Sequence, residues 1–425
     1  MSGEVIKFPE GFYWGAATSA HQVEGGNRND WSEWELESSK LKVKSAKLRE
    51  WPDYIFKNYP NPLQEENYIS GRACDHYNRF REDFDIAKRL GHNAHRFSIE
   101  WSRVEPEEGK FDEAAIEHYR QVIAALRERG MEPFVTLWHY TLPQWFARRG
   151  GWLHPRAVTD FSRYAKRVTA EYGREVRFWI TKNEPETFVR HAYLVGDRPP
   201  QQRNIFTTYR VLRRLLAAHR AAYDALKSKD PTAQVGFAET KVYFEPYRRL
   251  PHHMLTMKAV KWWRNNPLYR DFAARSDFIG LEYYFHSRIR LNPFTSRWAI
   301  QDNEDREVSD LGWEIYPQGL YHVLDELRSY RKPIYIVENG VADAADNQRA
   351  SFIRRHVEAV ARALHEGIDV RGYFYWSLLD NFEWQLGFWP RFGLVEVDYT
   401  TLERKIRPSA WEYKKIIEAN AVERG

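Results

Sequence analysis

The chain has 425 residues, of which 43% are hydrophobic and 29% are charged, with a formal net charge of +5. This length would suit two or three average domains, but no Pro-, Ser- or Gly-rich tract divides the chain, so we expect one domain over residues 1–425. The small positive excess is spread along the chain, which argues against nucleic acids or membrane surfaces as partners.

Two features concern the cellular compartment. The first ten residues lack a basic and then apolar leader, and no apolar run approaches the roughly 18 residues of a membrane span. Cys74 is the only cysteine, so an intrachain disulfide is excluded, as is typical of a reducing compartment. We therefore expect a cytoplasmic protein, whose oligomeric state the sequence leaves open.

Short apolar segments alternate with amphipathic helical segments along the chain. Strands are predicted over residues 12–17, 93–99, 133–137, 176–181, 233–238, 277–281, 333–337 and 370–376. Helices are predicted over residues 111–129, 157–172, 207–228, 317–330 and 348–367. Eight such alternations predict the α/β class and a single (β/α)8 or TIM barrel. We expect the polar insert 38–72 to be a loop over the barrel mouth.

Polar residues gather at the ends of the predicted strands, where TIM barrels carry their active sites. His139 follows the third strand and Glu184 the fourth, the pair Glu282 and Tyr284 follows the sixth, and Glu338 follows the seventh. An exposed acid in a turn would explain Glu184 on its own. The barrel prediction instead brings two glutamates together at one mouth.

The two glutamates differ in their local settings. Pro185 should hold Glu184 in extended backbone and end the strand there. Glu338 has the same strand parity as Ile334 and Ile336, so if these isoleucines fill the barrel, the carboxylate also points inward.

An inward carboxylate at Glu338 needs a cation, and Arg96 in the second strand offers one. Such a pair would lower the pKa of Glu338 and keep it ionised, although a purely structural ion pair explains the same residues. One ionised and one less charged carboxyl group are what glycoside hydrolysis requires. The 17 tryptophans agree equally with core packing and with sugar binding.

Several longer blocks of sequence occur in a fixed order. They are FPEGFYWGAATSAHQVEGG, ACDHYNRFREDFDIAKRLGHNAHRFSIEWSR, TLWHYTLPQW, WITKNEPETF, DFIGLEYY, LGWEIYPQGLYHVL, YIVENGVAD and GYFYWSLLDNFEWQLGFWPRFGLVEVDY. Through these blocks the chain resembles glycoside hydrolase family 1, the β-glucosidase family, over nearly its whole length. So many matches in the right order make chance an implausible explanation.

The resemblance implies a retaining β-glucosidase that forms a covalent glycosyl-enzyme from β-linked glucosides or oligosaccharides and uses no cofactor or metal. It also implies tolerance of galactosides or fucosides. Glu184 would be the acid/base and Glu338 the nucleophile. The other implied catalytic residues are Asn183, which would bond the sugar 2-hydroxyl, and Arg96 and Tyr284, which would flank the nucleophile. The implied sugar-binding residues are Gln22, His139, Trp376, Glu383 and Trp384.

Two positions bear on substrate and pH. Glu282 stands where the family usually has asparagine, and a third carboxylate would raise the pKa of its neighbours. Glu282 is then turned away, pairs with a cation or shifts the pH optimum upward, and we expect a cation beside it. The family's phosphorylated-sugar branch typically has serine at the position of Glu383. A carboxylate would repel a sugar phosphate, so we expect unphosphorylated substrates.

Rival functions remain open at this point. Barrel aldolases form a Schiff base at a strand-end lysine, but we expect Lys182 to be solvated or to lie on the leaving-group side, since no nearby motif would depress its pKa. A transglycosylase would use the same glycosyl-enzyme. A non-catalytic glycan-binding barrel would not need both glutamates.

The sequence says less about metal sites and about the identity of the leaving group. The pairs His92 and His95, and His252 and His253, lack the spacing of metal ligands. The loops that would select the leaving group span residues 38–72, 241–275 and 286–309, and their shape is not predictable from the pattern.

Overall fold

The computed structural model describes residues 5–57, 59–265, 268–291, 299–300 and 306–423. Within these residues, eight parallel strands form a barrel: β2 (Tyr13–Ala17), β3 (Ala94–Ser98), β4 (Glu132–Thr136), β5 (Phe178–Asn183), β6 (Gln234–Pro246), β7 (Phe278–Leu291), β9 (Ile334–Asn339) and β10 (Val370–Trp376). Pairing of β6 with β7 closes the ring. The predicted TIM barrel is confirmed, and β6 and β7 extend well past their predicted ends.

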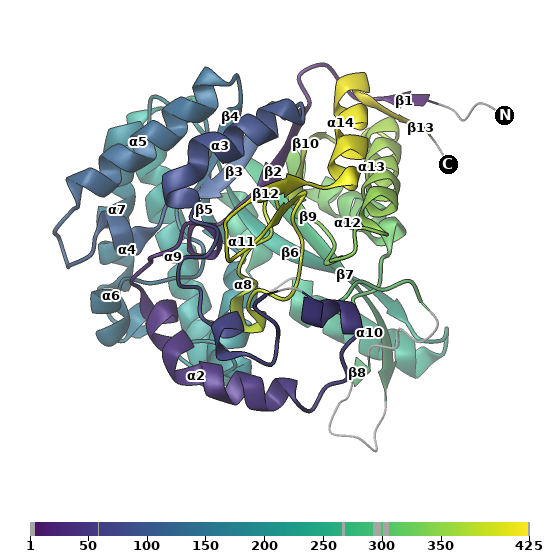
Figure 1. Ribbon diagram of the computed structural model, residues 1–425, viewed down its shortest axis with the longest axis horizontal. Helices are drawn as coiled ribbons and strands as arrows, with labels where there is room; N and C mark the ends of the chain where they lie inside the picture. Colours follow the sequence, from purple (N-terminus) through teal and green to yellow (C-terminus); the bar gives the residue numbers. More distant parts are fainter. Residues whose placement is uncertain (1–4, 58, 266–267, 292–298, 301–305, 424–425) are drawn as a thin grey trace.

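Helices surround the barrel (Figure 1). The longer ones are α2 (Asp30–Ala46), α3 (His76–Arg89), α5 (Glu113–Glu128), α7 (Ala157–Tyr172), α9 (Ile205–Lys229), α10 (Pro251–Asn265), α12 (Pro317–Leu327), α13 (Arg349–His365) and α14 (Pro408–Ala419). The five predicted helices correspond to α5, α7, α9, α12 and α13. No helix in the described part of the chain is long and apolar enough to cross a membrane.

Short elements connect these layers. The short helices are α1 (Ala20–Val23), α4 (Trp101–Val104), α6 (Gln144–Arg148), α8 (Pro185–Val189), α11 (Tyr269–Ala274), η1 (Asp53–Lys57), η2 (Glu65–Tyr68), η3 (Gly151–Leu153), the π-helix η4 (Arg190–Val195), η5 (Arg328–Tyr330) and η6 (Trp384–Leu386). The short strands form the pairs β1 (Val5–Lys7) with β13 (Ala421–Glu423) and β11 (Val395–Val397) with β12 (Arg404–Ile406), while β8 (Ala299–Ile300) pairs with β7.

The expectation of a loop over residues 38–72 is wrong for its first part, because α2 runs to Ala46. Asn29 caps this helix by accepting a hydrogen bond from the backbone N–H of Ser32 at 2.9 Å. Its buried face includes Trp31 and Trp34. Two buried indoles and a complete cap stabilise a helix whose sequence shows little apolar periodicity.

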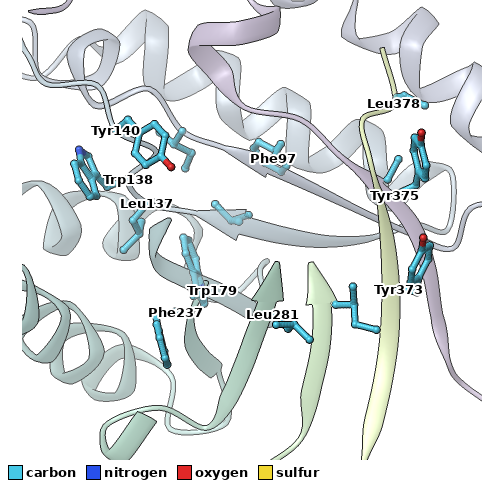
Figure 2. Close-up of a cluster of buried hydrophobic side chains, with 14 of the residues drawn as sticks. Phe97, Leu137, Trp138, Tyr140, Trp179, Phe237, Leu281, Tyr373, Tyr375 and Leu378 are labelled. Atoms are coloured by element: carbon cyan, nitrogen blue, oxygen red, sulfur yellow. The ribbon is translucent and has the colours of Figure 1, made fainter. Parts of the chain in front are cut away.

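The main apolar core lies between the strands and the helices, as Figure 2 shows. Phe97, Trp179, Phe237, Leu281 and Tyr373 come from five different strands and are all buried in this layer. This packing fixes the outer surface of the barrel.

A second, aromatic core fills the inside of the barrel. Phe134 and Phe178 stack with their ring centroids 4.2 Å apart, and Phe374 packs edge-on to Phe134. Tyr335 lies in the same cluster. This plug closes the lower barrel, so only the C-terminal end can hold a substrate.

The parity argument for Glu338 is wrong in its premise. Ile334 and Ile336 pack in the outer core, whereas Tyr335 and Val337 belong to the inner cluster. The register between β7 and β9 shifts by one residue just before Glu338. This bulge brings the carboxylate to the barrel mouth although simple alternation would direct it toward the helices.

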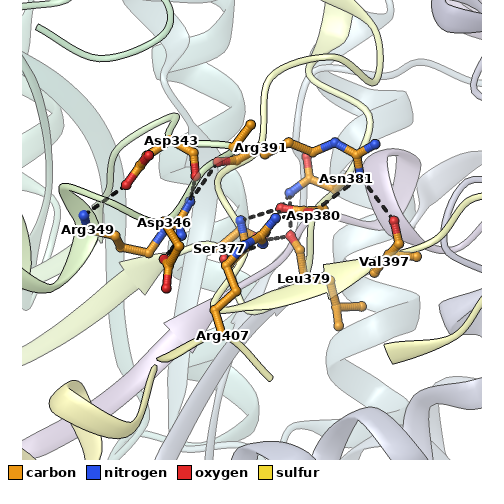
Figure 3. Close-up of polar contacts among 12 residues, drawn as sticks. Asp343, Asp346, Arg349, Ser377, Leu379, Asp380, Asn381, Arg391, Val397 and Arg407 are labelled. Carbon is orange, nitrogen blue, oxygen red and sulfur yellow. Dashed lines mark hydrogen bonds and ion pairs between the residues drawn. The ribbon is translucent and has the colours of Figure 1, made fainter. Parts of the chain in front are cut away.

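An ion network anchors the segment that follows β10 (Figure 3). Arg407 donates two hydrogen bonds to the buried carboxylate of Asp380, at 2.9 and 2.8 Å, and Arg391 adds a third contact at 3.3 Å. Asn381 donates to the hydroxyl of Ser377 at 3.0 Å. The network therefore fixes the chain just before Glu383.

Candidate active site

A pocket of about 290 Å³ opens at the C-terminal ends of the barrel strands. The predicted residues that line it are Gln22, His139, Glu184, Tyr284, Glu338, Trp376, Glu383 and Trp384. The other two predicted residues, Asn183 and Arg96, are buried and bonded to this set. All ten therefore meet at one mouth.

Glu338 lies at the base of the pocket between two donors. Arg96 donates to Oε1 of Glu338 at 2.5 Å, and the phenol of Tyr284 donates to Oε2 at 2.8 Å. Burial raises the pKa of Tyr284 well above its usual range, so this phenol keeps its proton. Both carboxylate oxygens are thus held in fixed positions.

Glu282 shares the same guanidinium, as expected from its need for a cation. Arg96 donates to Oε1 of Glu282 at 3.0 Å, and the glutamate is fully buried. Burial, and then the negative charge of Glu338, raise the pKa of Glu282 well above its usual range. Like charges beside one cation disfavour ionisation of both carboxyl groups, and the deeper burial of Glu282 favours its neutral form.

The pKa of Glu338 is itself raised by burial, against the charge of Arg96, which lowers it. The sequence-based expectation of a lowered pKa is therefore wrong in its net direction. It considered the ion pair and omitted the larger cost of removing the carboxylate from water.

A hydrogen-bonded chain leads from Arg96 to His139 in the pocket wall. Arg96 donates to Oδ1 of Asn183, and Nδ2 of Asn183 lies 3.1 Å from Nε2 of His139. Burial lowers the pKa of His139 well below its usual range, so the ring is neutral. A neutral ring accepts at Nε2 and carries its proton at Nδ1.

Glu184 does not have the extended backbone that Pro185 predicted. Its φ and ψ are +40° and +57°, in the left-handed region. Its N–H still donates to the carbonyl of Ala238 at 2.8 Å, while its own carbonyl accepts from Phe188 at 2.9 Å to begin α8. Leaving a strand and starting a helix at one residue imposes this strained conformation, which is common at functional sites.

The side chain of Glu184 is held by two hydroxyl groups that the sequence analysis missed. Tyr140 donates to Oε2 and Thr240 to Oε1. Tyr140 also has a positive φ, of 74°. Tyr140 directly follows His139, and Thr240 directly follows the buried Glu239. Their position after a predicted strand was the only feature of the sequence that could have indicated a role in the site.

Another part of the pocket wall combines amide, acid and indole groups. Gln22 donates to Oε2 of Glu383 at 3.5 Å and to the carbonyl of Phe382 at 2.8 Å. Burial raises the pKa of Glu383 to about 8, and the charge of Arg198 opposes this. Trp376 and Trp384 are 4% and 5% exposed, so the parts of these rings that face the pocket are shielded from bulk water.

Three arginines that no motif singled out also line the pocket, namely Arg190, Arg198 and Arg264. Nε and Nη1 of Arg198 are buried without a hydrogen-bond partner among the described residues. These side chains come from the segment after α8 and from the end of α10, where the sequence offered no strand pattern.

The expectation of a solvated Lys182 is wrong. The residue is fully buried, and Nζ lies 3.0 Å from the ring centroid of Phe161 and 4.1 Å from that of Trp152. Burial lowers the pKa of Lys182 well below its usual range. A register shift in β5 turns the side chain toward the helices, so it lies behind the barrel wall and does not line the pocket.

His92 and His95 are both buried, and their rings pack against Tyr413 and Phe84, respectively. Over the described ranges, no group of three or more His, Cys, Asp or Glu side chains could hold a metal ion.

Comparison with known proteins identifies the family of this chain. The family model described as Glycosyl hydrolase family 1 matches residues 4–271 and 264–422. Beta-glucosidase A of Thermotoga maritima is 31% identical over 460 residues, with 99% of each chain covered. A solved beta-glycosidase from Pyrococcus horikoshii is 35% identical, with a TM-score of 0.86 and coverage of 99% and 97%. A Thermotoga maritima beta-glucosidase in complex with glucoimidazole is 30% identical, with a TM-score of 0.87 and coverage of 99% and 100%. The chain belongs to glycosyl hydrolase family 1.

Proposed function

We propose that the protein is a retaining β-glucosidase that hydrolyses terminal, unphosphorylated β-D-glucosides through a covalent glycosyl-enzyme. The observation that carries this proposal is the pair of acids in one pocket, each held by its own donors. Glu338 accepts hydrogen bonds from Arg96 and Tyr284, and Glu184 accepts them from Tyr140 and a threonine hydroxyl. Two carboxyl groups in distinct settings are suited to two distinct roles.

In the first step, the carboxylate of Glu338 attacks the anomeric carbon and forms the ester bond to the sugar. The bond from that carbon to the leaving oxygen breaks, and the carboxyl proton of Glu184 moves to this oxygen. The hydrogen bonds of Arg96 and Tyr284 fix the attacking oxygens in place. Their preorganisation removes the need to orient the carboxylate during reaction.

In the second step, water attacks the anomeric carbon of the glycosyl-enzyme. The Glu184 carboxylate accepts a proton from this water, the ester bond to Glu338 breaks, and the enzyme returns to its starting state. Two displacements at the same carbon give a product with the original configuration.

The remaining predicted residues suit a glucose ring in the pocket. Asn183 lies beside Arg96 and can bond the 2-hydroxyl, a contact that strengthens as positive charge develops at the anomeric carbon. The neutral ring of His139 can donate from Nδ1 to a neighbouring hydroxyl. Gln22 and Glu383 can bond outer hydroxyls of either orientation, which supports galactosides and fucosides as further substrates.

The two indoles would orient the sugar. Trp376 would lie beneath the sugar ring, and Trp384 would lie beside the outer hydroxyls. The proposal of unphosphorylated sugars rests on Glu383 standing where the phosphorylated-sugar branch typically has serine. Because its pKa is raised to about 8, its charge would repel a phosphate mainly above that pH.

We further propose that the whole chain acts as one catalytic domain in the cytoplasm. The family match spans nearly all of the sequence. Cys74 is a buried free thiol, which agrees with a reducing compartment. Cell fractionation with a tagged protein would test the location.

The test of the reaction is a time-resolved proton NMR spectrum of the hydrolysis of an aryl β-D-glucoside. A retaining enzyme releases β-glucose first, and the α-anomer appears only later by mutarotation. If α-glucose is the first product, the double displacement is wrong. If no glucose is released, the substrate assignment is wrong.

A further inference from the structure

A second cavity of about 290 Å³ lies beside the active-site pocket. We call it the side cavity. Its apolar walls come from α8, η4, the first turns of α9 and the end of α10, and they include Val189, Leu194, Ile205, Phe206, Leu212 and Trp263. Phe206 is 83% exposed and Trp263 46% exposed. Such large exposed apolar groups around a cavity are typical of a binding site for an apolar ligand.

Two arginines connect the side cavity with the active site. Arg190 and Arg264 line both the side cavity and the pocket that contains Glu184 and Glu338. A molecule with one end in the sugar pocket can therefore extend past these two side chains into the apolar space.

Arg190 is fixed by a hydrogen bond to a neighbouring histidine and, within the described part of the chain, still has an unused N–H donor. Its Nη2 lies 2.7 Å from Nε2 of His191, whose Nδ1 lies 2.9 Å from Asp197. Burial lowers the pKa of His191 to about 3, so the neutral ring accepts from Arg190 and donates to Asp197. Nε of Arg190 is buried and has no partner among the described residues.

The guanidinium groups lack direct counter-ions. Among the described residues, neither Arg190 nor Arg264 has a carboxylate oxygen within 4.0 Å. Burial lowers the pKa of Arg190 to about 9 and lowers that of Arg264 as well. Partly buried cations without a paired anion are costly, and a bound anion would remove that cost.

The position of these arginines points to the leaving-group side of the site. The charge of Glu184, the proposed proton donor, acts on both Arg190 and Arg264. Arg198 is influenced by both acids, by Glu184 first and by Glu383 as well, whereas Glu383 is not among the charges that act on Arg190 or Arg264. Because the leaving oxygen must face Glu184, the rest of the leaving group extends toward Arg190 and Arg264.

Resting on the proposed function, we infer that the side cavity binds the leaving group of the substrate. The occupant is an aglycone with an apolar body, which fills the side cavity, and an anionic group such as a carboxylate, which pairs with Arg190 and Arg264. The contacts would act as a selectivity filter that is separate from recognition of the sugar.

One acid, Glu186, also lines the side cavity. Its Oε1 is buried without a partner among the described residues, and burial raises its pKa to about 7. At and below that pH a large share of this carboxyl group is protonated, so it can donate to a bound carboxylate and need not repel it.

The charge half of the inference is tested with two aryl β-glucosides of matched phenol acidity. One carries a carboxymethyl group at the para position and the other the corresponding carbamoylmethyl group. We expect wild-type protein to favour the acid about tenfold in kcat/KM, the size of one charge-assisted contact. In the Arg190→Gln/Arg264→Gln double variant the ratio should fall to about one. Arg354→Gln, which removes an exposed arginine of α13, should keep the wild-type ratio.

The apolar half is tested with alkyl β-glucosides. Thr208 lines the side cavity from α9, and Thr208→Trp would fill it. Wild-type protein should favour hexyl over methyl β-glucoside at least about fivefold in kcat/KM, because the hexyl chain buries additional methylene groups in the side cavity. Thr208→Trp should abolish that preference while methyl glucoside is cleaved as before.

The outcomes separate this inference from the proposed function. Cleavage of all four glucosides with ratios near one in wild-type protein would overturn the inference and leave the β-glucosidase intact. Cleavage of none of them would overturn the β-glucosidase. A preference that persists unchanged in the double variant and in Thr208→Trp would place the leaving group elsewhere.

Discussion

The hydrogen bond from the phenol of Tyr284 to Glu338 should help to set the pH below which activity is lost. It donates to Oε2 of Glu338 at 2.8 Å and keeps its own proton. Glu338 must be ionised to attack, and its pKa is already raised by burial. Tyr284→Phe removes a donor that favours the ionised form, so the pKa of Glu338 must rise further. Activity should therefore be lost at a higher pH as the solution is acidified.

The size of the shift follows from the strength of this contact. A hydrogen bond to a charged group contributes about 1.5–3 kcal/mol, and 1.36 kcal/mol corresponds to one pKa unit. The full loss would raise the pKa by roughly one to two units. Water that enters the space of the hydroxyl would recover part of this, so we expect a shift of about one unit.

The assay is the pH profile of kcat/KM with an aryl β-glucoside, whose acid limb reports the free enzyme. Tyr283→Phe is a matched control, because the Tyr283 hydroxyl donates to the carbonyl of Tyr316 at 2.8 Å on the other face of the strand. The control should keep the wild-type acid limb. An acid limb that stays in place or moves down in Tyr284→Phe would refute the assignment of this limb to Glu338.

Three further changes test other parts of the account. Glu282→Gln should leave the acid limb within about 0.3 unit, since burial already keeps Glu282 neutral; a large downward shift in the pH profile would mean that Glu282 is charged. Asp380→Asn should cost about 3–5 kcal/mol of unfolding free energy in denaturant titrations, because it leaves Arg407 without its counter-ion. Since the pKa of Asp380 is depressed in the folded state, the wild-type advantage should shrink as the pH falls below the ordinary pKa of aspartate, and a constant difference would exclude this linkage. Lys182→Met should preserve kcat/KM and should not lower stability, because Nζ has no hydrogen-bond partner among the described residues; borohydride trapping of a carbonyl substrate on wild-type protein would contradict this inert role.

The barrel and its two acids were predictable from sequence because both depend on local pattern. Predicted strands of five to seven largely apolar residues alternate with amphipathic helices, and this repetition specifies the TIM barrel. Glu184 and Glu338 each follow a predicted strand and stand in motifs that resemble the family. Arg96 was identified as the cation that an inward carboxylate needs.

Other features depend on register and burial, which residue spacing does not reveal. Ile334 and Ile336 face the helices, opposite to the expectation, and a one-residue shift after them brings Glu338 to the barrel mouth. Another shift in β5 buries Lys182. The pKa of a carboxyl group depends on the balance of desolvation and charge, so naming Arg96 gave only one of the two contributions.

The leaving-group side was the least predictable part. Its cavity is assembled from α8, η4, α9 and α10, which approach one another only in the folded chain. Arg190 and Arg264 lie 74 positions apart in the sequence, and neither belongs to a motif. Their shared role can be inferred only from the three-dimensional arrangement.

The central claim is that Glu338 is the nucleophile of a retaining mechanism. Incubation with an activated 2-deoxy-2-fluoro-β-glucoside, which forms a glycosyl-enzyme faster than water can release it, tests this claim by intact and peptide mass spectrometry. The account predicts one sugar adduct on the peptide that carries Glu338. An adduct on another peptide, or none on an enzyme that still cleaves aryl β-glucosides, would contradict it.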